Sequence, residues 1–370
     1  MVYPYVTFWD VLLESYALNL AEKGHNLTIV TSDRDSCEPK IIKHPRISIR
    51  HLDSISVSVP GLIVSFPYLL SLEQTLRELQ PDIIHINNLP FPSTLQATLI
   101  AKKLKIPSIV HVHGVISNIN WFLNTAQYFF IYTMGRRIFN DATFIICLTR
   151  SDAKEIQRCG CPPEKIRIIP NGVDVEKFKP YGDVIDNSLF WGGRFVQQKG
   201  LEYLLNALYL VAKREPEIKL VMTGDGPLFS KTRNVVRQLG LERSVIFKGR
   251  VPRDELPRLI GASSVYLLPS LKEGMPFALL EAMACGKSIV GSDIPGINDL
   301  IAHGKSGILV PPRKPEVLAN AIVDLLSNED FRRNLGQNAR RLVVEKYSWT
   351  KIVEKVEEVY FEAAEGINKA

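Results

Sequence analysis

The chain has 370 residues, 46% of them hydrophobic and 23% charged, a composition that can bury sizeable cores and excludes an intrinsically disordered chain. At about 150 residues per domain, this length predicts two or three domains. Its 45 Lys and Arg against 39 Asp and Glu give a net charge of +6, which is too mild to indicate nucleic-acid binding by itself.

Cysteine usage and the N-terminal sequence indicate the compartment. The five cysteines form neither a CxxC pair nor a zinc-ligand spacing, and a disulfide framework would leave one of them unpaired. The first residues lack the basic stretch and apolar run of a signal peptide, and no run reaches the roughly 18 apolar residues of a membrane span. We therefore expect a cytoplasmic protein, either soluble or peripheral at the inner face of the membrane.

Short apolar runs alternate with helix-length amphipathic stretches along most of the chain, a pattern typical of parallel βαβ units. In chain order, strands are expected at residues 27–31, 83–86, 108–112, 144–148, 188–191, 219–223, 244–247, 265–268 and 288–290. Helices are expected at 201–213, at 315–326 with a proline at the start, and at 350–365. The sequence thus predicts an α/β protein with two doubly wound parallel-sheet domains.

The periodicity is interrupted from Pro180 to Asp183, just before the second series of strands, and this marks the expected linker. We expect an N-terminal domain at 1–180, a C-terminal domain at 181–348 and a terminal helix at 349–370. That helix must pack against an apolar surface, because one face carries Ile352, Val353, Val356, Val359 and Tyr360.

The most informative stretch runs from Leu268 to Gly286 and carries two carboxylates. Glu273 is expected in a loop at the carboxyl end of a strand, where open α/β sheets bind ligands. Pro276 suits the first turn of the following helix, which places Glu281 further along its axis. The N–H groups at that helix start could hold a phosphate, with the carboxylates binding hydroxyls beside it. The alternative is an exposed loop acid and a surface helix acid.

Two cations lie in the glycine-rich stretch from Trp191 to Gly200. Arg194 and Lys199 flank a loop that can close around an anion, and Gly193 lets the backbone approach it. Each cation would supply roughly 4 kcal/mol of gross Coulomb attraction at about 4 Å and an effective dielectric constant near 20, against about 0.3–2 kcal/mol for a helix dipole. The side chains would then stabilise a departing diphosphate, unless both are simply solvated surface cations.

Three shorter motifs carry weaker signals. The turn from Gly224 to Pro227 begins like a dinucleotide fingerprint but has Phe229 at the third glycine position, so we expect it to shape the mouth of another nucleotide site. His113 follows a strand and is either a structural or a functional histidine. Asp33 and Asp35 form a DxD pair that could hold a metal, although the other candidate diphosphate groups lie in the opposite half of the chain.

No acidic residue lies between Asp82 and Asp141, a region with five lysines and arginines and many aromatic residues. This combination suits an anionic membrane surface or an amphiphilic acceptor. The alternative is an aromatic core with a solvated basic edge. The cations are Lys102, Lys103, Lys105, Arg136 and Arg137, and the aromatic residues are Trp121, Phe122, Tyr128, Phe129, Phe130, Tyr132 and Phe139.

Taken together, these residues resemble the retaining, nucleotide-sugar-dependent glycosyltransferases of family 4, which have the two-domain GT-B fold. The resemblance runs from about Glu14 to Val359, and its specificity comes from the order and spacing of the motifs. They are Ala21 to His25, Pro81 to His85, His113-Gly114, Pro170 to Asp174 with Phe178, Gly193-Arg194 with Lys199-Gly200, Gly224 to Pro227, Glu273 with Glu281, and Tyr347 to Trp349.

The resemblance implies a role for each matching residue. Arg194 and Lys199 are implied to grip the donor diphosphate, Glu281 to bind the donor ribose and Glu273 to contact the transferred sugar. His113 is implied to reach that sugar from the N-terminal domain, and the terminal helix to return to that domain. The implied backbone and base contacts are Gly193, Gly274, Met275, Pro276 and Phe277 for the sugar and phosphate, and Arg250 and Val251 for the base.

One departure concerns the start of the chain, where family members have a full strand and then a Gly-Gly loop near donor and acceptor. Thr7 and Phe8 stand near that position here, so the first strand is expected to be shortened. We expect a metal-independent transferase that moves a hexose-type sugar from a UDP- or GDP-sugar to a carbohydrate or lipid-linked acceptor with retention. The alternatives are a sugar-nucleotide epimerase or phosphorylase of related architecture, and a non-catalytic nucleotide-binding subunit.

Overall fold

The computed structural model describes residues 1, 10–32, 44–58, 65–89, 91–114, 125, 128–182 and 184–368. These residues form two compact units. The first contains the described residues up to Asn171 together with the terminal helix α13 (Trp349–Asn368), and the second contains Gly172–Ser348.

The first unit contains parallel strands at the expected positions, 27–32, 84–87, 108–112 and 144–147, and two that were not expected, at 47–52 and 166–168. β5 (Ile84–Asn87), β6 (Ser108–Val112), β7 (Phe144–Cys147) and β8 (Ile166–Ile168) form a four-stranded parallel sheet in that order, and β1 (Leu27–Ser32) pairs in parallel with β2 (Ile47–Leu52). The helices of this unit are α1 (Asp10–Glu22), α2 (Leu72–Leu79), α3 (Pro92–Leu104), α5 (Arg136–Asp141) and α6 (Arg150–Arg158), with a π-helical turn at Ile131–Gly135.

One element departs from the purely parallel pattern expected from the sequence. β3 (Ser54–Ser58) and β4 (Ser65–Leu69) pair antiparallel as a separate two-stranded sheet. Each segment is only five residues long and mixes polar with apolar residues, so it lacks the continuous apolar run on which the sequence interpretation depends.

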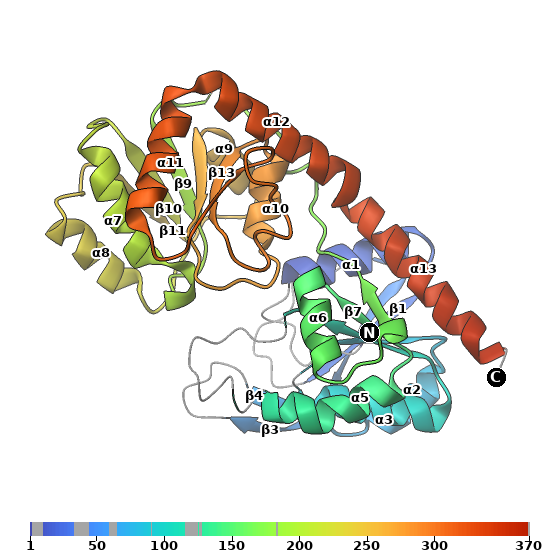
Figure 1. Cartoon of the computed structure of the whole chain (residues 1–370). Coiled ribbons are helices and arrows are strands. Elements are labelled where there is room, and N and C mark those ends of the chain that lie inside the picture. The colour runs from blue at the N-terminus through green and yellow to red at the C-terminus, as the bar shows by residue number, and fades with distance from the viewer. Residues whose placement is uncertain are drawn as a thin grey trace. The chain divides into compact units, whose positions relative to one another are not determined.

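The terminal helix belongs to the first unit, as the family resemblance implied. α13 contacts α1 (Figure 1), and its residues Ile352, Val353 and Val356 are fully buried. Tyr360 on the same helix shares a hydrogen bond with His85 of β5, 2.6 Å from Tyr360 Oη to His85 Nδ1. The apolar stripe of the last helix therefore completes the core of a unit whose other elements come from the first half of the chain.

The second unit is a doubly wound domain. Its six parallel strands are β9 (Ser188–Gly192), β10 (Lys219–Thr223), β11 (Val245–Gly249), β12 (Val265–Leu268), β13 (Ser288–Ser292) and β14 (Ile308–Val310), in the order β11-β10-β9-β12-β13-β14. The chain winds from β9 to one side and then from β12 to the other, so the topological switch point lies between β9 and β12. Open α/β sheets bind ligands at the carboxyl ends of their strands at this point.

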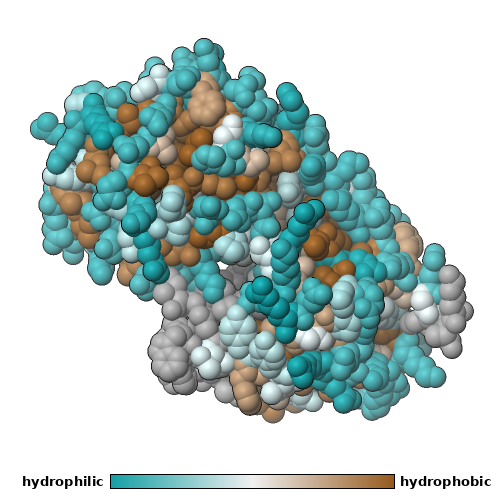
Figure 2. Space-filling view, viewed as in Figure 1, coloured by the Kyte–Doolittle hydropathy of each residue, from teal (hydrophilic) through white to brown (hydrophobic). Residues whose placement is uncertain are grey.

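Helices cover both faces of this sheet (Figure 1). α7 (Leu201–Ala212), α8 (Phe229–Gln238) and α11 (Pro315–Ser327) supply buried residues to one core cluster, whereas α10 (Phe277–Ala284) contacts both α9 (Leu256–Gly261) and α12 (Glu329–Lys346). On the face shown in Figure 2, hydrophilic residues cover most of the surface and hydrophobic residues show between them.

Prolines begin two of these helices in different ways. Pro315 lies in the first turn of α11, as expected. Pro276 is the N-cap of α10, one residue before the predicted position in its first turn, with an extended backbone (φ −73°, ψ 119°). It therefore ends the preceding loop, and it still costs the helix no hydrogen bond.

Candidate functional site

A cavity of about 330 Å³ opens at the switch point of the second unit. Its walls come from the ends of β9, β10 and β12, the turn after β11, and the helices α9 and α10. The lining residues are Phe190, Gly192, Gly193, Thr223, Gly224, Arg250, Val251, Leu256, Ile260, Tyr266, Ala278 and Glu281. The structure thus brings together Gly193, Val251 and Glu281, which are far apart in the sequence.

The glycine turns after β9 and β10 touch each other at the cavity wall. Gly193 N donates a hydrogen bond to the carbonyl oxygen of Thr223 over 3.0 Å. Gly224 has a φ of +117°, and a Cβ atom there would lie 1.9 Å from the carbonyl oxygen of Gly193. Only glycine fits this contact, so the turn that resembled a dinucleotide fingerprint instead shapes the mouth of this cavity.

Lys199 and Glu273 form a partly buried ion pair beside the same wall. Lys199 Nζ donates to Glu273 Oε1 over 2.7 Å, and the hydroxyl of Ser270 donates to the same oxygen over 2.6 Å. A Cβ atom on Gly193 would lie 3.6 Å from Lys199 Cε, which places the lysine stem next to the cavity lining. The two residues predicted to hold the diphosphate and the sugar are thus in direct contact.

Another glycine makes this pairing possible. Gly200 has a φ of +64°, and a Cβ atom there would lie 2.0 Å from the carbonyl oxygen of Pro269. Leu271 N also donates to the carbonyl oxygen of Gln198 over 2.7 Å. These contacts hold the lysine loop against the loop that carries Glu273.

Glu281 is 6% exposed on α10 and pairs with Arg253, whose Nη2 donates to Glu281 Oε1 over 2.7 Å. Burial raises the pKa of Glu281 to about 6, and the nearby Arg253 acts in the opposite direction. The Arg253 guanidinium also lies over the ring of Phe178, 5.5 Å from its centroid. A surface helix acid, the alternative interpretation of the sequence, does not describe this buried and paired carboxylate.

The loop between Glu273 and α10 contains the residues predicted to supply backbone contacts. Met275 and Pro276 are buried, whereas Gly274 and Phe277 are partly exposed. Gly296, with a φ of +84°, packs against this loop, because a Cβ atom there would lie 2.0 Å from the carbonyl oxygen of Gly274.

The remaining predicted cations are exposed. Arg250, 85% exposed in its side chain, lines the cavity and lies 3.4 Å from Asp225, measured from Nε to Oδ2. Arg194 is exposed in the loop after β9, where its neighbour Phe195 donates its backbone N–H to the carbonyl oxygen of Asp225 over 2.9 Å. Both arginines therefore lie on turns beside the cavity.

His113 lies in the first unit, just after β6. Its Nε2 and Asn87 Oδ1 share a hydrogen bond of 3.1 Å, and its ring stacks on His111 with centroids 4.2 Å apart. Burial lowers the pKa of His113 to about 3, so its imidazole is neutral near pH 7. The donor to Asn87 Oδ1 is then the Nε2–H tautomer.

The acid-free region carries exposed aromatic and basic groups in its described part. Phe129 is 72% exposed, with Tyr132 and Met134 also exposed, and Asp141 at its end pairs with Lys102. Three predicted features, at Thr7-Phe8, Asp33-Asp35 and Trp121-Phe122, lie outside the described residues. Within the described chain, no helix has the length and apolar character needed to cross a membrane.

Sequence reasoning missed Arg253, Ser270 and Gly296. A buried acid needs a cation within reach, so the burial of Glu281 would have called for a partner, but the sequence marks neither that burial nor which of many arginines satisfies it. Ser270 acts within its own loop, three residues from Glu273, whereas Gly296 acts through a contact with Gly274 in a loop that is not adjacent in the sequence.

Two family models match the chain, and together they span most of it. Glycosyltransferase Family 4 matches residues 11–177, and Glycosyl transferases group 1 matches residues 182–342. The N-acetyl-alpha-D-glucosaminyl L-malate synthase of Bacillus anthracis is 27% identical over 97% of this chain and 95% of that protein. The UDP-Gal:alpha-D-GlcNAc-diphosphoundecaprenol alpha-1,3-galactosyltransferase of Escherichia coli is 29% identical over 82% of this chain and 81% of that protein.

Among solved structures, Anabaena HepE in complex with UDP-glucose superposes with a TM-score of 0.80 at 19% identity, covering 98% of both chains. At this identity the likeness concerns the fold, and the family models carry the family assignment. The chain belongs to the group 1, family 4 glycosyltransferases, which are retaining, nucleotide-sugar-dependent enzymes with the GT-B fold.

Proposed function

We propose that the protein transfers a hexose-type sugar from a UDP- or GDP-sugar to a carbohydrate or lipid-linked acceptor hydroxyl in glycolipid, glycan or polysaccharide biosynthesis. The observation that carries this proposal is the cavity at the switch point of the second unit, with the buried carboxylate of Glu281 in its wall. A carboxylate in such a crevice is suited to accept hydrogen bonds from ribose hydroxyls.

In this proposal, the Lys199–Glu273 pair is a resting arrangement that the donor rearranges. The ammonium of Lys199 has three N–H groups, so it can turn toward a diphosphate while it stays near Glu273. Glu273 can then accept hydrogen bonds from hydroxyls of the transferred sugar. Because the pair is largely shielded from water, the charges of both side chains act strongly on a ligand beside them.

The proposed chemistry uses cations and backbone N–H groups in place of a metal. As the sugar–oxygen bond breaks, negative charge develops on the diphosphate, and Lys199 with Arg194 stabilises it. A diphosphate oxygen takes the proton of the acceptor hydroxyl as that hydroxyl attacks the same face of the sugar, so the configuration is retained. The residues around Gly274 to Phe277 hold the sugar and phosphate, and Val251 contacts the base.

His113 is proposed as the residue of the first unit that contacts the transferred sugar. Its imidazole is neutral near pH 7 and its bond to Asn87 orients the ring, which suits a hydrogen bond with a sugar hydroxyl.

The acceptor is proposed to be membrane-associated, with the protein bound peripherally through its N-terminal unit. The exposed Phe129, Tyr132 and Met134 lie close in the chain to the exposed Arg136 and Arg137, a combination that suits an anionic lipid surface. The Escherichia coli relative acts, by its name, on a diphosphoundecaprenol-linked sugar. Sedimentation with anionic but not with neutral vesicles is expected, and equal behaviour with both would contradict it.

Calorimetric binding of UDP, GDP, ADP and their sugar conjugates tests the donor site. One diphosphate is expected to bind specifically to the wild type and to lose most of its affinity in the Arg194→Ala, Lys199→Ala double variant. The matched control is the Arg341→Ala, Lys346→Ala double variant, which removes two exposed cations from α12. Equal affinity in both double variants would refute the assigned diphosphate contacts.

Turnover tests the chemistry. With a lipid-linked acceptor pool, Glu273→Ala is expected to lower kcat strongly while donor affinity changes less. Unchanged turnover in this variant would remove Glu273 from the site. Consumption of the donor without any acceptor would favour an epimerase or a phosphorylase.

A further inference from the structure

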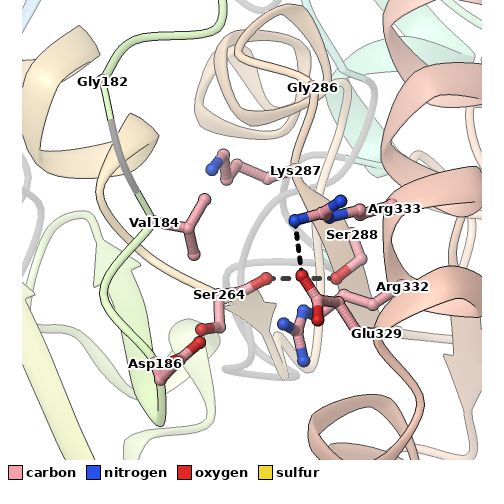
Figure 3. Close-up of a pocket in the computed structure, with 10 residues that line it drawn as sticks. All are labelled: Gly182, Val184, Asp186, Ser264, Gly286, Lys287, Ser288, Glu329, Arg332 and Arg333. Atoms are coloured by element: carbon pink, nitrogen blue, oxygen red, sulfur yellow. Dashed lines mark hydrogen bonds and ion pairs between the residues drawn. The ribbon is translucent and has the colours of Figure 1, made fainter.

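A second cavity, of about 410 Å³, lies in the second unit at the amino ends of its strands. Its floor contains Ser264, which directly precedes β12, and Ser288, which begins β13 (Figure 3). Since the strands are parallel, their first residues lie at the opposite end of the sheet from Gly193 and the donor cavity. This amino-end cavity is therefore separate from the site described above.

A buried lysine forms part of its wall. Lys287 is 7% exposed, and its Nζ donates to the carbonyl oxygens of Gly261 over 2.5 Å and Ser263 over 3.0 Å. These carbonyls are at the carboxyl end of α9, so the ammonium caps that helix. An ammonium has three N–H groups, so one remains beyond these two bonds.

Arg332 on α12 is placed in the same manner. Its Nη1 donates to the carbonyl oxygens of Leu325 and Leu326 over 3.0 and 3.1 Å, in the last turn of α11. A guanidinium has five N–H groups, so Nε and Nη2 keep three donors beyond these two bonds. Among the described residues, no carboxylate forms an ion pair with either Lys287 or Arg332.

The remaining charges of the cavity are one more cation and two carboxylates. Arg333 Nη2 pairs with Glu329 Oε1 over 2.5 Å within α12, which largely neutralises that carboxylate. Asp186 lies on the opposite side of the cavity from α12 (Figure 3). Three cations against two carboxylates leave a positive excess, concentrated at Lys287 and Arg332.

We propose that the amino-end cavity binds a phosphorylated small molecule of about the size of a hexose phosphate. Lys287 and Arg332 hold its phosphate, because their unused N–H groups and their charges match phosphate oxygens. Asp186 and the hydroxyls of Ser264 and Ser288 accept hydrogen bonds from hydroxyls of the sugar. A bare phosphate ion would leave most of this cavity empty, and its volume lies within the range of ordinary small-molecule sites.

The protonation states support phosphate binding near neutral pH. Burial lowers the pKa of Lys287 to about 8, so its ammonium stays mostly charged at pH 7. A phosphate monoester carries its second negative charge above about pH 6.

Calorimetry on the full chain with glucose 6-phosphate and with inorganic phosphate tests the proposal. The wild type is expected to bind glucose 6-phosphate at least tenfold more tightly than inorganic phosphate, because only the former offers hydroxyls. Arg332→Gln should weaken glucose 6-phosphate binding about tenfold, the usual effect of losing a charged hydrogen bond. The matched control on the same helix, Arg341→Gln, should bind like the wild type, since Arg341 is exposed and does not line the cavity.

Two further variants identify the site. If Lys287→Met folds, it tests the second phosphate contact. Arg332 is more exposed than Lys287, so Arg332→Gln tests the site even if the Lys287→Met variant does not fold. Lys199→Met, on the donor side, should leave glucose 6-phosphate binding unchanged. Loss of binding in Lys199→Met with full binding in Arg332→Gln would overturn the proposal, as would no binding by the wild type. Equal affinity for both phosphates would overturn the recognition of a sugar.

Discussion

Glu281 is expected to lower the stability of the protein at neutral pH, and Glu281→Gln should therefore raise it. Burial raises the pKa of this carboxyl from 4.5 to about 6 in the folded protein. A carboxyl with a raised folded pKa contributes stability below about pH 4.5 and loses it as the pH rises through 6. A shift of about 1.5 pKa units corresponds to about 2 kcal/mol, present at pH 4 and absent at pH 7.

The assay compares the thermal unfolding of wild type and Glu281→Gln at pH 4 and at pH 7. The amide stays neutral at both pH values and can still accept a hydrogen bond from Arg253. The Tm difference between variant and wild type should therefore be about 4–8 °C more favourable to the variant at pH 7, at about 2–4 °C per kcal/mol. Any effect of the substitution on stability that is the same at pH 4 and at pH 7 cancels in this comparison.

The same variant should bind the nucleoside diphosphate about tenfold more weakly, because a neutral amide is a poorer acceptor for ribose hydroxyls than a carboxylate. A gain in stability with a loss of affinity would mean that the buried charge serves binding at the expense of folding. A Tm difference independent of pH would refute the raised pKa, and an unchanged affinity would refute the ribose contact.

Three other variants test contacts described above. Gly224→Ala should lower Tm and weaken donor binding more than tenfold, since its Cβ would lie 1.9 Å from the carbonyl oxygen of Gly193; wild-type affinity would contradict this. Tyr360→Phe should cost about 1–3 kcal/mol in urea unfolding, because buried His85 loses a hydrogen bond, and an unchanged midpoint would exclude this contribution. Lys165→Met should lower the free energy of unfolding by a similar amount and reduce Tm, because Lys165 Nζ donates to three carbonyl oxygens at the end of α5. An unchanged Tm would show that water molecules replace the ammonium at these carbonyl oxygens.

Much of the fold could be predicted because parallel strands are buried on both faces. Every residue of β5, β6 and β12 is buried, and such strands appear in the sequence as short apolar runs between helices. β2 has half-exposed and exposed positions with Arg and His among them, so its segment gave no comparable signal. The polar helix α12 was missed for a similar reason, since only a few of its residues are buried.

The sequence marked Gly193, Val251 and Glu281, which line the cavity, but it did not predict the contacts between the loops. Glycines, cations and carboxylates at the carboxyl ends of strands marked the loops that line the cavity. The pairing of Lys199 with Glu273 joins residues 74 positions apart, and no local pattern encodes it. Arg253 could not be singled out, because only the fold shows that Glu281 is buried beside it.

The return of α13 to the first unit has a consequence for the order of events during synthesis. Among the described residues, the second unit is one continuous segment and can fold as soon as it leaves the ribosome, whereas the first must wait for the last residues of the chain. Until then, the surface of α1 that α13 covers stays open to chaperones or to other chains. A nascent or truncated chain that ends before Trp349 would thus combine a folded second unit with an incomplete first unit.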